Sequence, residues 1–234
     1  MTECIILAGG MGTRLRNAAG NTPKPMIKVE GSPFLEILLS YVMSFGIRKF
    51  IFSVGHGADQ IEKHFGDGSR HGVAILYSKE SEKLLGTGGA LKRSLSLASS
   101  ERVLAMNGDS ICLAHFGRLL EFDASASSTA TILGVHVNDT SRFGTMVVEG
   151  SHLVEFNEKT GQNIPGLINA GVYVLSRKHI LDSRTPEVFS IERDYFEKLP
   201  PRSIKVFETK GDFIDIGVPE DLSRLPEFIH RNKI

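Results

Sequence analysis

Residues 4–15 read CIILAGGMGTRL, so that a run of apolar residues leads directly into a loop rich in glycine. The run 4–8 has the length and composition of a buried strand. Glycines at positions 9, 10 and 12 leave no side chains where this strand turns, which lets backbone N–H groups approach an anion closely. The stretch therefore predicts a buried strand that ends in a loop able to bind phosphate.

Positive charge gathers around this loop, although the chain as a whole is neutral. No acidic residue lies between Glu3 and Glu30. The same stretch carries four cations, which are Arg14, Arg16, Lys24 and Lys28. The pattern is not a Walker A motif, and Leu15 stands where the dinucleotide fingerprint has its third glycine. The cations favour a polyphosphate ligand; a glycine turn that merely reverses the chain is the alternative interpretation.

Short apolar runs alternate with amphipathic stretches along the first half of the chain. The further predicted strands are 50–54, 73–77 and 103–106. The predicted helices are 34–45, 58–65 and 88–98, and Ser32-Pro33 is expected to supply the N-cap and first residue of the first one. This alternation predicts a parallel sheet with helices on both faces, which binds its ligand at the carboxyl ends of the strands.

The second half has fewer helical patterns. Its predicted strands are 130–137, 145–148, 153–156 and 168–175. Two helices are predicted at 191–199 and 219–228, and Pro226 is expected to end the second of them early. Since no linker, repeat or low-complexity segment divides the chain, we expect a single α/β domain over residues 1–234. Its sheet would be mixed, mainly parallel and flanked by helices, with a small extension.

Composition excludes several classes of protein. The 234 residues carry 27 Lys plus Arg and 27 Asp plus Glu, so no overall positive field attracts nucleic acid or an acidic membrane. No apolar run approaches the roughly 20 residues of a membrane span, and residues 1–10 lack the basic region of a secretory signal. We therefore expect a cytoplasmic protein without nucleic-acid or membrane partners.

Cysteine and histidine usage suggests no metal or redox framework. Cys4 and Cys112 are expected to be buried free thiols. His56, His64 and His71 fall within sixteen residues, but their spacing is not that of a zinc site, and no function is assigned to them.

Several motifs follow the glycine-rich loop in a fixed order. They are GGMGTRL at 9–15, PKPM at 23–26, LGTGGA at 85–90, NGD at 107–109, FG at 143–144, FNEK at 156–159, INAG at 168–171 and IDIGVPED at 214–221. This series resembles the signature of the sugar-1-phosphate nucleotidylyltransferases over nearly the whole chain. The resemblance implies a Rossmann-like fold of the nucleotidyltransferase or GT-A-like type. Residues 1–110 would mainly bind the nucleotide, and residues 111–234, with the sheet extension, would mainly bind the sugar phosphate.

Within this family, the likeness is nearest to the guanylyltransferases of heptose 1-phosphate. It implies GTP and D-glycero-alpha-D-manno-heptose 1-phosphate as substrates, and GDP-heptose for surface polysaccharide as product. A sugar 1-phosphate is mostly dianionic at neutral pH, so its oxygen can attack the α-phosphorus of GTP without a covalent enzyme intermediate, and pyrophosphate leaves. Transfer to mannose 1-phosphate, or transfer from UTP to an amino-sugar 1-phosphate, is an alternative.

Two more distant functions fit less well. A metal-dependent glycosyltransferase also uses an aspartate near a strand end, but it needs no pyrophosphate-binding loop with cations. A non-catalytic nucleotide sensor would be expected to have lost Lys24, Asp109 or Asp215, and all three are present. The family resemblance also makes a homo-oligomer plausible.

Asp109 and Asp215 are the candidate metal ligands. Asp109 follows strand 103–106, and Asp215 lies between two isoleucines in an apolar segment, where a carboxylate is costly unless paired or metal-bound. Mg²⁺ prefers one or two carboxylates together with phosphate oxygens. Either aspartate could instead cap a turn at a strand end. The resemblance favours the metal, because the matching family positions hold the catalytic Mg²⁺.

The resemblance also implies roles on the nucleotide side. Lys24 would steady the α-phosphate, and Arg14 with the glycine backbone would hold the β- and γ-phosphates. The expected catalytic residues are Arg14, Lys24, Asp109 and Asp215. The expected nucleotide-binding residues are Leu7, Ala8, Gly9, Gly10, Gly12, Thr13, Arg14, Lys24, Glu80, Gly86, Thr87, Asn107 and Asp109.

The segment 78–82, which reads SKESE, contains the candidate base reader. Guanine offers an N1–H and an N2 amino group on one edge, and one carboxylate can accept both. Glu80 is the candidate. An extra residue at 83–85, relative to the family pattern, leaves Glu82 as a second possibility. A solvated charged loop is the third interpretation.

The acceptor side rests on the resemblance alone. Lys159 would bind the phosphate of the sugar and Glu158 its hydroxyls, while Asn169 and the backbone of Gly144 would touch the sugar. An amide suits hydroxyl recognition, because it both donates and accepts hydrogen bonds. A surface Glu-Lys pair without function and a turn residue at position 169 are the alternatives.

Overall fold

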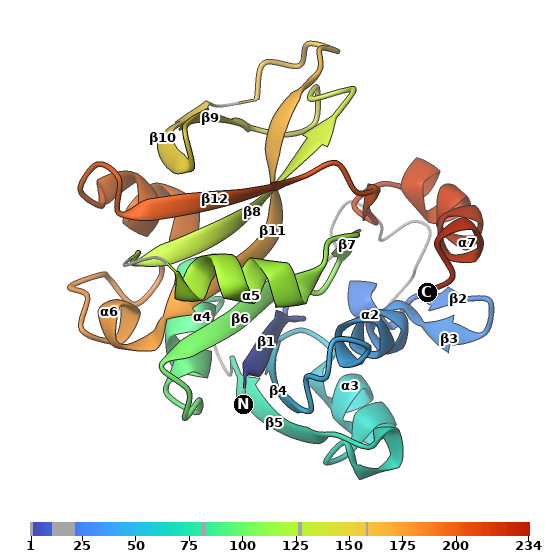
Figure 1. The fold of residues 1–234 in the computed structure, drawn as a ribbon. Helices are drawn as coiled ribbons and strands as arrows, with labels where there is room; N and C mark the ends of the chain where they lie inside the picture. Colours follow the sequence, from blue (N-terminus) through green and yellow to red (C-terminus); the bar gives the residue numbers. More distant parts are fainter. Residues whose placement is uncertain (1, 11–21, 81–82, 126–127, 158) are drawn as a thin grey trace.

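The computed structural model describes residues 2–10, 22–80, 83–125, 128–157 and 159–234. Within these residues a nine-stranded mixed sheet has the order β5-β4-β1-β6-β11-β8-β12-β10-β9 (Figure 1). Its strands are β1 (Glu3–Leu7), β4 (Lys49–Val54), β5 (Ala74–Lys79), β6 (Arg102–Asn107), β8 (Ala130–Val137), β9 (Thr145–Glu149), β10 (His152–Asn157), β11 (Gly166–Ser176) and β12 (Ile204–Thr209). Strands β5, β4, β1 and β6 are parallel, and antiparallel pairing begins where β11 joins β6.

Helices cover both faces of the sheet, as the alternating pattern predicts. They are α2 (Phe34–Met43), α3 (Ala58–Phe65), α4 (Gly86–Leu95), α5 (Phe116–Ala124), α6 (Arg177–Leu181) and α7 (Pro219–Asn232). Successive side chains of a strand point to opposite faces. Accordingly Cys4 and Ile6 pack in the core beneath α2, α3, α5 and α7, whereas Ile5 packs with residues of α4 and α6. The expected mixed α/β fold is confirmed.

The strand predictions agree with the structure to within about two residues, but three helix predictions need correction. Helix α2 begins at Phe34, because Ser32–Pro33 is extended and pairs with Lys28–Val29 as strands β3 and β2. Segment 191–199 is a π turn, Ile191–Tyr195, followed by a 3₁₀ turn. Helix α7 continues past Pro226 to Asn232.

The burial of later side chains explains why Pro226 does not end α7. A proline inside a helix removes one backbone hydrogen bond. Phe228 and Ile229 follow it and are buried in the core, and each such side chain contributes about 1.5–3 kcal/mol. Packing of the last turns therefore outweighs the loss at the proline.

Both cysteines are buried free thiols, as expected. Burial raises the pKa of Cys4 well above its usual range and that of Cys112 to about 12. Neither is a candidate nucleophile, since the thiolate is the reactive form. Across the described residues, no helix is both long and apolar enough to cross a membrane.

Candidate active site

A cavity of about 300 Å³ opens at the carboxyl ends of β1, β4 and β6. These strands are parallel neighbours, so their carboxyl ends meet at one edge of the sheet, where α/β proteins bind ligands (Figure 1). The cavity is lined by Leu7, Gly9, Gly10, Lys24, Pro25, Ser53, Glu80, Leu84, Gly86, Thr87, Ala90, Asn107 and Asp109. Most of the residues expected to bind the nucleotide thus lie around one space. Ala8 is different, because its side chain is buried in the core.

Lys24 connects this cavity to both candidate metal ligands. Its ammonium nitrogen lies 2.6 Å from Asp109 Oδ2 and 3.8 Å from Asp215 Oδ1. Lys24 sits in a 3₁₀ turn, Lys24–Met26, that follows Pro23. Its side chain is only 12% exposed, so the cation is held between the two acids rather than in bulk solvent.

A short two-stranded ribbon brings the two acids together. Strands β7 (Ser110–Cys112) and β13 (Phe213–Asp215) are antiparallel, with Asp215 opposite Ser110. The backbone N–H of Ile216 donates a hydrogen bond of 2.9 Å to the carbonyl of Asp109. The ribbon therefore fixes Asp109 and Asp215 side by side, although about a hundred residues separate them in the chain.

The chemistry of this pair fits a divalent cation. Asp215 Oδ1 is buried and has no hydrogen-bond partner in the described part of the chain. Burial, and next the nearby charge of Asp109, raise the pKa of Asp215, while Lys24 opposes that rise. A carboxylate oxygen in this position is satisfied by a hard cation, and the two aspartates supply the oxygen ligands that Mg²⁺ prefers. Asp109 and Asp215 are the residues that could hold it.

Glu80 faces the same cavity from the end of β5. Its Oε1 accepts a hydrogen bond of 2.9 Å from the backbone N–H of Leu85. Its Oε2 lies beside the backbone of Gly9 and Gly55, where a Cβ atom at either position would come within about 3.0 Å of it. The carboxylate is therefore held in place between the glycine loop and the start of α4.

A hydrogen-bonded chain links the nucleotide side to Asn169. Asn169 Nδ2 donates to the hydroxyl of Tyr173, and that hydroxyl donates to Glu192 Oε1, both at 2.9 Å. Thr87 donates to the other oxygen of Glu192 at 3.3 Å. Sequence reasoning missed Tyr173 and Glu192, since neither lies in a recognised motif. No sequence pattern marks them. The structure identifies them, because Tyr173 is buried beside a turn in which Gly171 has a positive φ.

That turn is a break in strand β11 at Gly171. The register of β11 against β8 shifts between Asn169 and Tyr173, and Gly171 has a φ of +71°. A Cβ atom at Gly171 would lie 2.3 Å from the side-chain nitrogen of Asn107. Only glycine lets β11 approach β6 this closely, so the break places Gly171, two residues after the predicted acceptor residue Asn169, against the predicted donor residue Asn107.

The remaining acceptor residues lie at the end of the β9–β10 extension. Gly144 precedes β9, and a Cβ atom there would come within 2.7 Å of the carbonyl of Asn157. Lys159 is exposed two residues beyond β10, and it does not line the cavity described above. Five predicted site residues lie outside the described residues. They are Gly12, Thr13, Arg14, Glu82 and Glu158.

A second cavity of about 610 Å³ adjoins the acid pair. Asp215 lines it, together with Arg142 and Asp221, which form an ion pair. Each acid therefore lines a different cavity, with Asp109 on the wall of the first and Asp215 on the wall of the second. Sequence reasoning did not single out Arg142, because an isolated arginine carries no spacing signal.

Comparison with known proteins places this geometry in a family. The family model described as nucleotidyl transferase matches residues 3–232. The chain belongs to the nucleotidyl transferase family. This nucleotidyl transferase is 36% identical to the D-glycero-alpha-D-manno-heptose 1-phosphate guanylyltransferase of Aneurinibacillus thermoaerophilus, over 94% of each chain. It is also 36% identical to the protein of the same name from Campylobacter jejuni, over 94% of this chain and 96% of the relative.

Solved structures agree with the family assignment. The crystal structure of HddC from Yersinia pseudotuberculosis, complexed with GMP-PN, superposes on this nucleotidyl transferase with a TM-score of 0.87. The two chains are 35% identical, and the match covers 98% of this chain and 100% of HddC. The enzyme class expected from the motifs is therefore confirmed.

Proposed function

We propose that this enzyme transfers the guanylyl group of GTP to D-glycero-alpha-D-manno-heptose 1-phosphate, releasing pyrophosphate and forming GDP-heptose. The observation that carries the proposal is the convergence of Lys24, Asp109 and Asp215 beside the cavity at the end of β1. Similarity to two heptose 1-phosphate guanylyltransferases supports the choice of sugar, and similarity to HddC complexed with GMP-PN supports the choice of nucleotide.

The residues on the donor side bind and align the triphosphate. The ammonium group of Lys24 faces the α-phosphate, and Arg14 with the N–H groups of the glycine loop binds the phosphates that leave as pyrophosphate. Alignment and charge neutralisation are the main contributions that a protein makes to such a transfer, because the attacking phosphate oxygen needs no activation. In this proposal, no side chain forms a covalent bond to the substrate.

Asp109 and Asp215 would hold Mg²⁺. When bound, the cation neutralises charge that develops on the reacting phosphates. Two observations support this assignment: in the described residues the buried Oδ1 of Asp215 accepts no hydrogen bond, and both acids lie close to the same ammonium group of Lys24, at 2.6 and 3.8 Å. Lys24 shares the space between the acids, so the ammonium group stays close to the point at which the α-phosphate is attacked.

The acceptor would be bound by residues of the second half. Asn169 is oriented by Tyr173, and Gly144 lies beside it because Thr145 of β9 is opposite Ile168 of β11. Lys159 and Glu158, at the end of β10, would complete the site by contacting the phosphate and hydroxyls of the sugar. For the base, Glu80 is the proposed acceptor of the guanine N1–H and N2 amino groups.

A substrate grid tests the proposal. Four nucleoside triphosphates are combined with heptose, mannose and glucosamine 1-phosphates in the presence of Mg²⁺, and pyrophosphate release is measured. We expect the highest kcat/KM for GTP with heptose 1-phosphate. Asp109→Asn protein, purified in parallel, controls for contaminating activity. A preference for UTP with the amino-sugar phosphate, or no release with any GTP pair, would overturn the proposal.

A further inference from the structure

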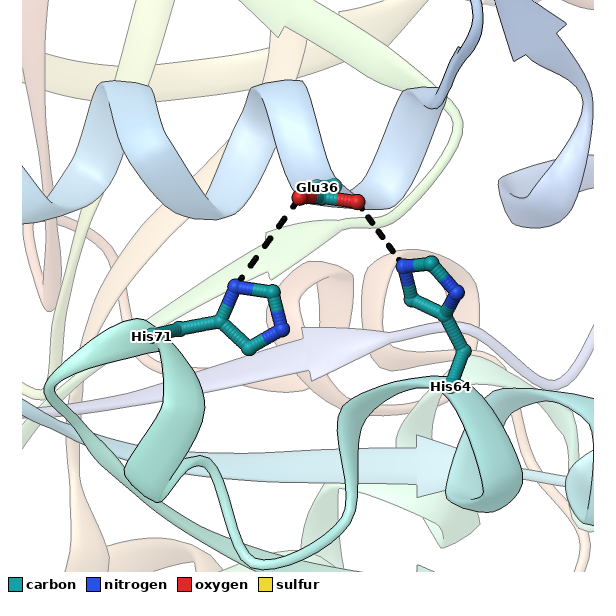
Figure 2. Close-up of side chains that lie close together, drawn as sticks. All are labelled: Glu36, His64 and His71. Atoms are coloured by element: carbon teal, nitrogen blue, oxygen red, sulfur yellow. Dashed lines mark hydrogen bonds and ion pairs between the residues drawn. The ribbon is translucent and has the colours of Figure 1, made fainter.

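Three side chains from different elements, Glu36 and the two histidines at 64 and 71, meet at the surface between α2 and α3. Glu36 lies in the first turn of α2, His64 in the last turn of α3, and His71 in the 3₁₀ turn Ser69–His71. One ligand atom from each lies within 4.8 Å of the other two. Figure 2 shows both imidazole rings directed at the carboxylate, each facing a different oxygen.

The distances are close to those of a metal site. His64 Nε2 lies 2.8 Å from Glu36 Oε2, and His71 Nδ1 lies 3.9 Å from Glu36 Oε1. In a tetrahedral zinc site with bonds of about 2.0–2.1 Å, neighbouring ligand atoms are about 3.3 Å apart. The two observed separations, one to each carboxylate oxygen, lie on either side of this value. Since one ligand atom from each residue lies within 4.8 Å of the other two, side-chain rotations can bring two nitrogens and one carboxylate oxygen around one ion.

The backbone holds the two histidines in place. A tight turn returns the chain from α3 to β5. In it, the N–H of Gly68 donates a hydrogen bond to the carbonyl of Phe65, and the N–H of His71 donates one to the carbonyl of Gly68. Gly68 has a φ of +86°, and a Cβ atom there would lie 2.8 Å from the carbonyl of Val73. The geometry of the turn is therefore fixed by its sequence, and the imidazole of His71 needs no rearrangement of the chain to face α2.

A buried aromatic ring supports both imidazoles. The ring centroid of Phe65 lies 4.7 Å from that of His64 and 5.4 Å from that of His71. Phe65 is itself buried in the core. The three ligand side chains are 20–36% exposed, so an ion can enter from solvent and keep a water molecule as its remaining ligand.

We propose that Glu36, His64 and His71 form a Zn²⁺ site that clamps α2 to α3 and to the following turn. Two imidazole nitrogens and one carboxylate oxygen are typical ligands of Zn²⁺, whereas Mg²⁺ prefers oxygen ligands alone. The site is separate from the candidate catalytic acids, and it contributes no residue to the cavity at the end of β1. Because it joins three elements, its expected role is to stabilise the fold.

Zinc titration of the full-length protein tests this site. The protein is stripped of metal, kept in excess Mg²⁺, and titrated with ZnCl₂ by isothermal titration calorimetry. We expect one equivalent to bind, and the Kd to rise at least about tenfold in Glu36→Gln and in His71→Ala, since even outer-shell partners have effects of this size. His179→Ala, which changes an exposed histidine on α6, should bind as the unaltered protein does.

Thermal unfolding gives an independent readout. Zinc at 100 times its Kd should raise the Tm by about 5–10 °C in the unaltered protein and in Asp215→Asn, but not in Glu36→Gln or His71→Ala. Asp215→Asn removes one of the two catalytic acids, so a rise in Tm that persists in this variant does not come from zinc bound there. The proposal is overturned if no equivalent binds, or if the Glu36 and His71 variants retain the affinity and the rise in Tm.

Discussion

The ammonium group of Lys24 lies 2.6 Å from the carboxylate of Asp109 and also faces Asp215, at 3.8 Å. One largely buried cation is therefore shared by two acids that a hydrogen-bonded ribbon holds together. The positive charge of Lys24, on the nucleotide side, thus contacts both carboxylates that are proposed to bind the metal. Changes to any of the three should therefore affect catalysis more than folding.

Asp109→Asn and Asp215→Asn should each lower turnover at least ~100-fold, which is the scale of losing one electrostatic catalytic group. An amide keeps the shape of the side chain but cannot supply the negative charge that holds Mg²⁺. Far-UV circular dichroism and the Tm should show that both variants are folded. Near-normal turnover in both, at saturating GTP, heptose 1-phosphate and Mg²⁺, would contradict the metal role.

Glu80→Gln should lower kcat/KM for GTP about 10- to 100-fold, since a hydrogen bond to a charged group contributes about 1.5–3 kcal/mol. Inosine triphosphate isolates the effect, because hypoxanthine keeps the N1–H of guanine but lacks its N2 amino group. The unaltered enzyme should prefer GTP over the inosine nucleotide, and Glu80→Gln should lose much of that preference.

Glu82→Gln is the matched comparison for Glu80→Gln, since both residues lie in the segment 78–82 and only Glu80 is among the described residues. We expect its GTP preference to be unchanged. If the Glu82 variant loses the preference instead, Glu82 is the base reader. If both variants keep it, no carboxylate of this segment reads the base.

Much of the fold could be predicted from local sequence patterns. The strands 4–8, 50–54 and 103–106 are short apolar runs between turn signals, and each corresponds to a strand of the parallel part of the sheet. Gly9, Gly10 and Asp109 lie at the carboxyl edge, as predicted, because parallel strands all end on the same side. Short-range periodicity was sufficient for these elements.

Contacts between distant segments could not be predicted. Strands β7 and β13 have only three residues each, too few for a periodic signal, yet their pairing brings Asp215 to Asp109. The Glu36–His64–His71 cluster was missed for a similar reason: its ligands come from three elements, so their spacing follows no zinc-site pattern. The link from Asn169 to Glu192 likewise depends on the bulge at Gly171.

Tyr173→Phe should lower kcat/KM for the sugar 1-phosphate about tenfold, which corresponds to one lost hydrogen bond of about 1–1.5 kcal/mol. The hydroxyl of Tyr173 accepts a hydrogen bond from Asn169 Nδ2, and its removal leaves that nitrogen without this partner, while the Gly171 N–H still donates to Asn169 Oδ1. Tyr195→Phe is the control, because the hydroxyl of Tyr195 is buried without a hydrogen-bond partner in the described residues. Equal kinetic constants for the two variants would show that the hydrogen bond between Tyr173 and Asn169 does not contribute to sugar binding.

Glu3→Gln should reduce the free energy of unfolding at pH 7 by about 1.5–3 kcal/mol, the scale of hydrogen bonds to a charged group. Burial opposes ionisation of Glu3, but hydrogen bonds from Ser100 and Ser99 outweigh it and lower the pKa of this carboxyl. A carboxyl whose pKa is lower in the native state stabilises the fold above its unfolded pKa, near 4.3. This stabilisation is lost as the pH falls through the native pKa.

Urea unfolding of the unaltered protein and of Glu3→Gln at pH 7, 5 and 4 measures this effect. The difference in the free energy of unfolding between the two proteins should shrink only at the acid end. Glu121→Gln changes an exposed residue of α5, and its free energy of unfolding should match that of the unaltered protein at every pH. If Glu3→Gln is instead less stable by the same amount at every pH, the charge of Glu3 is not what stabilises the fold.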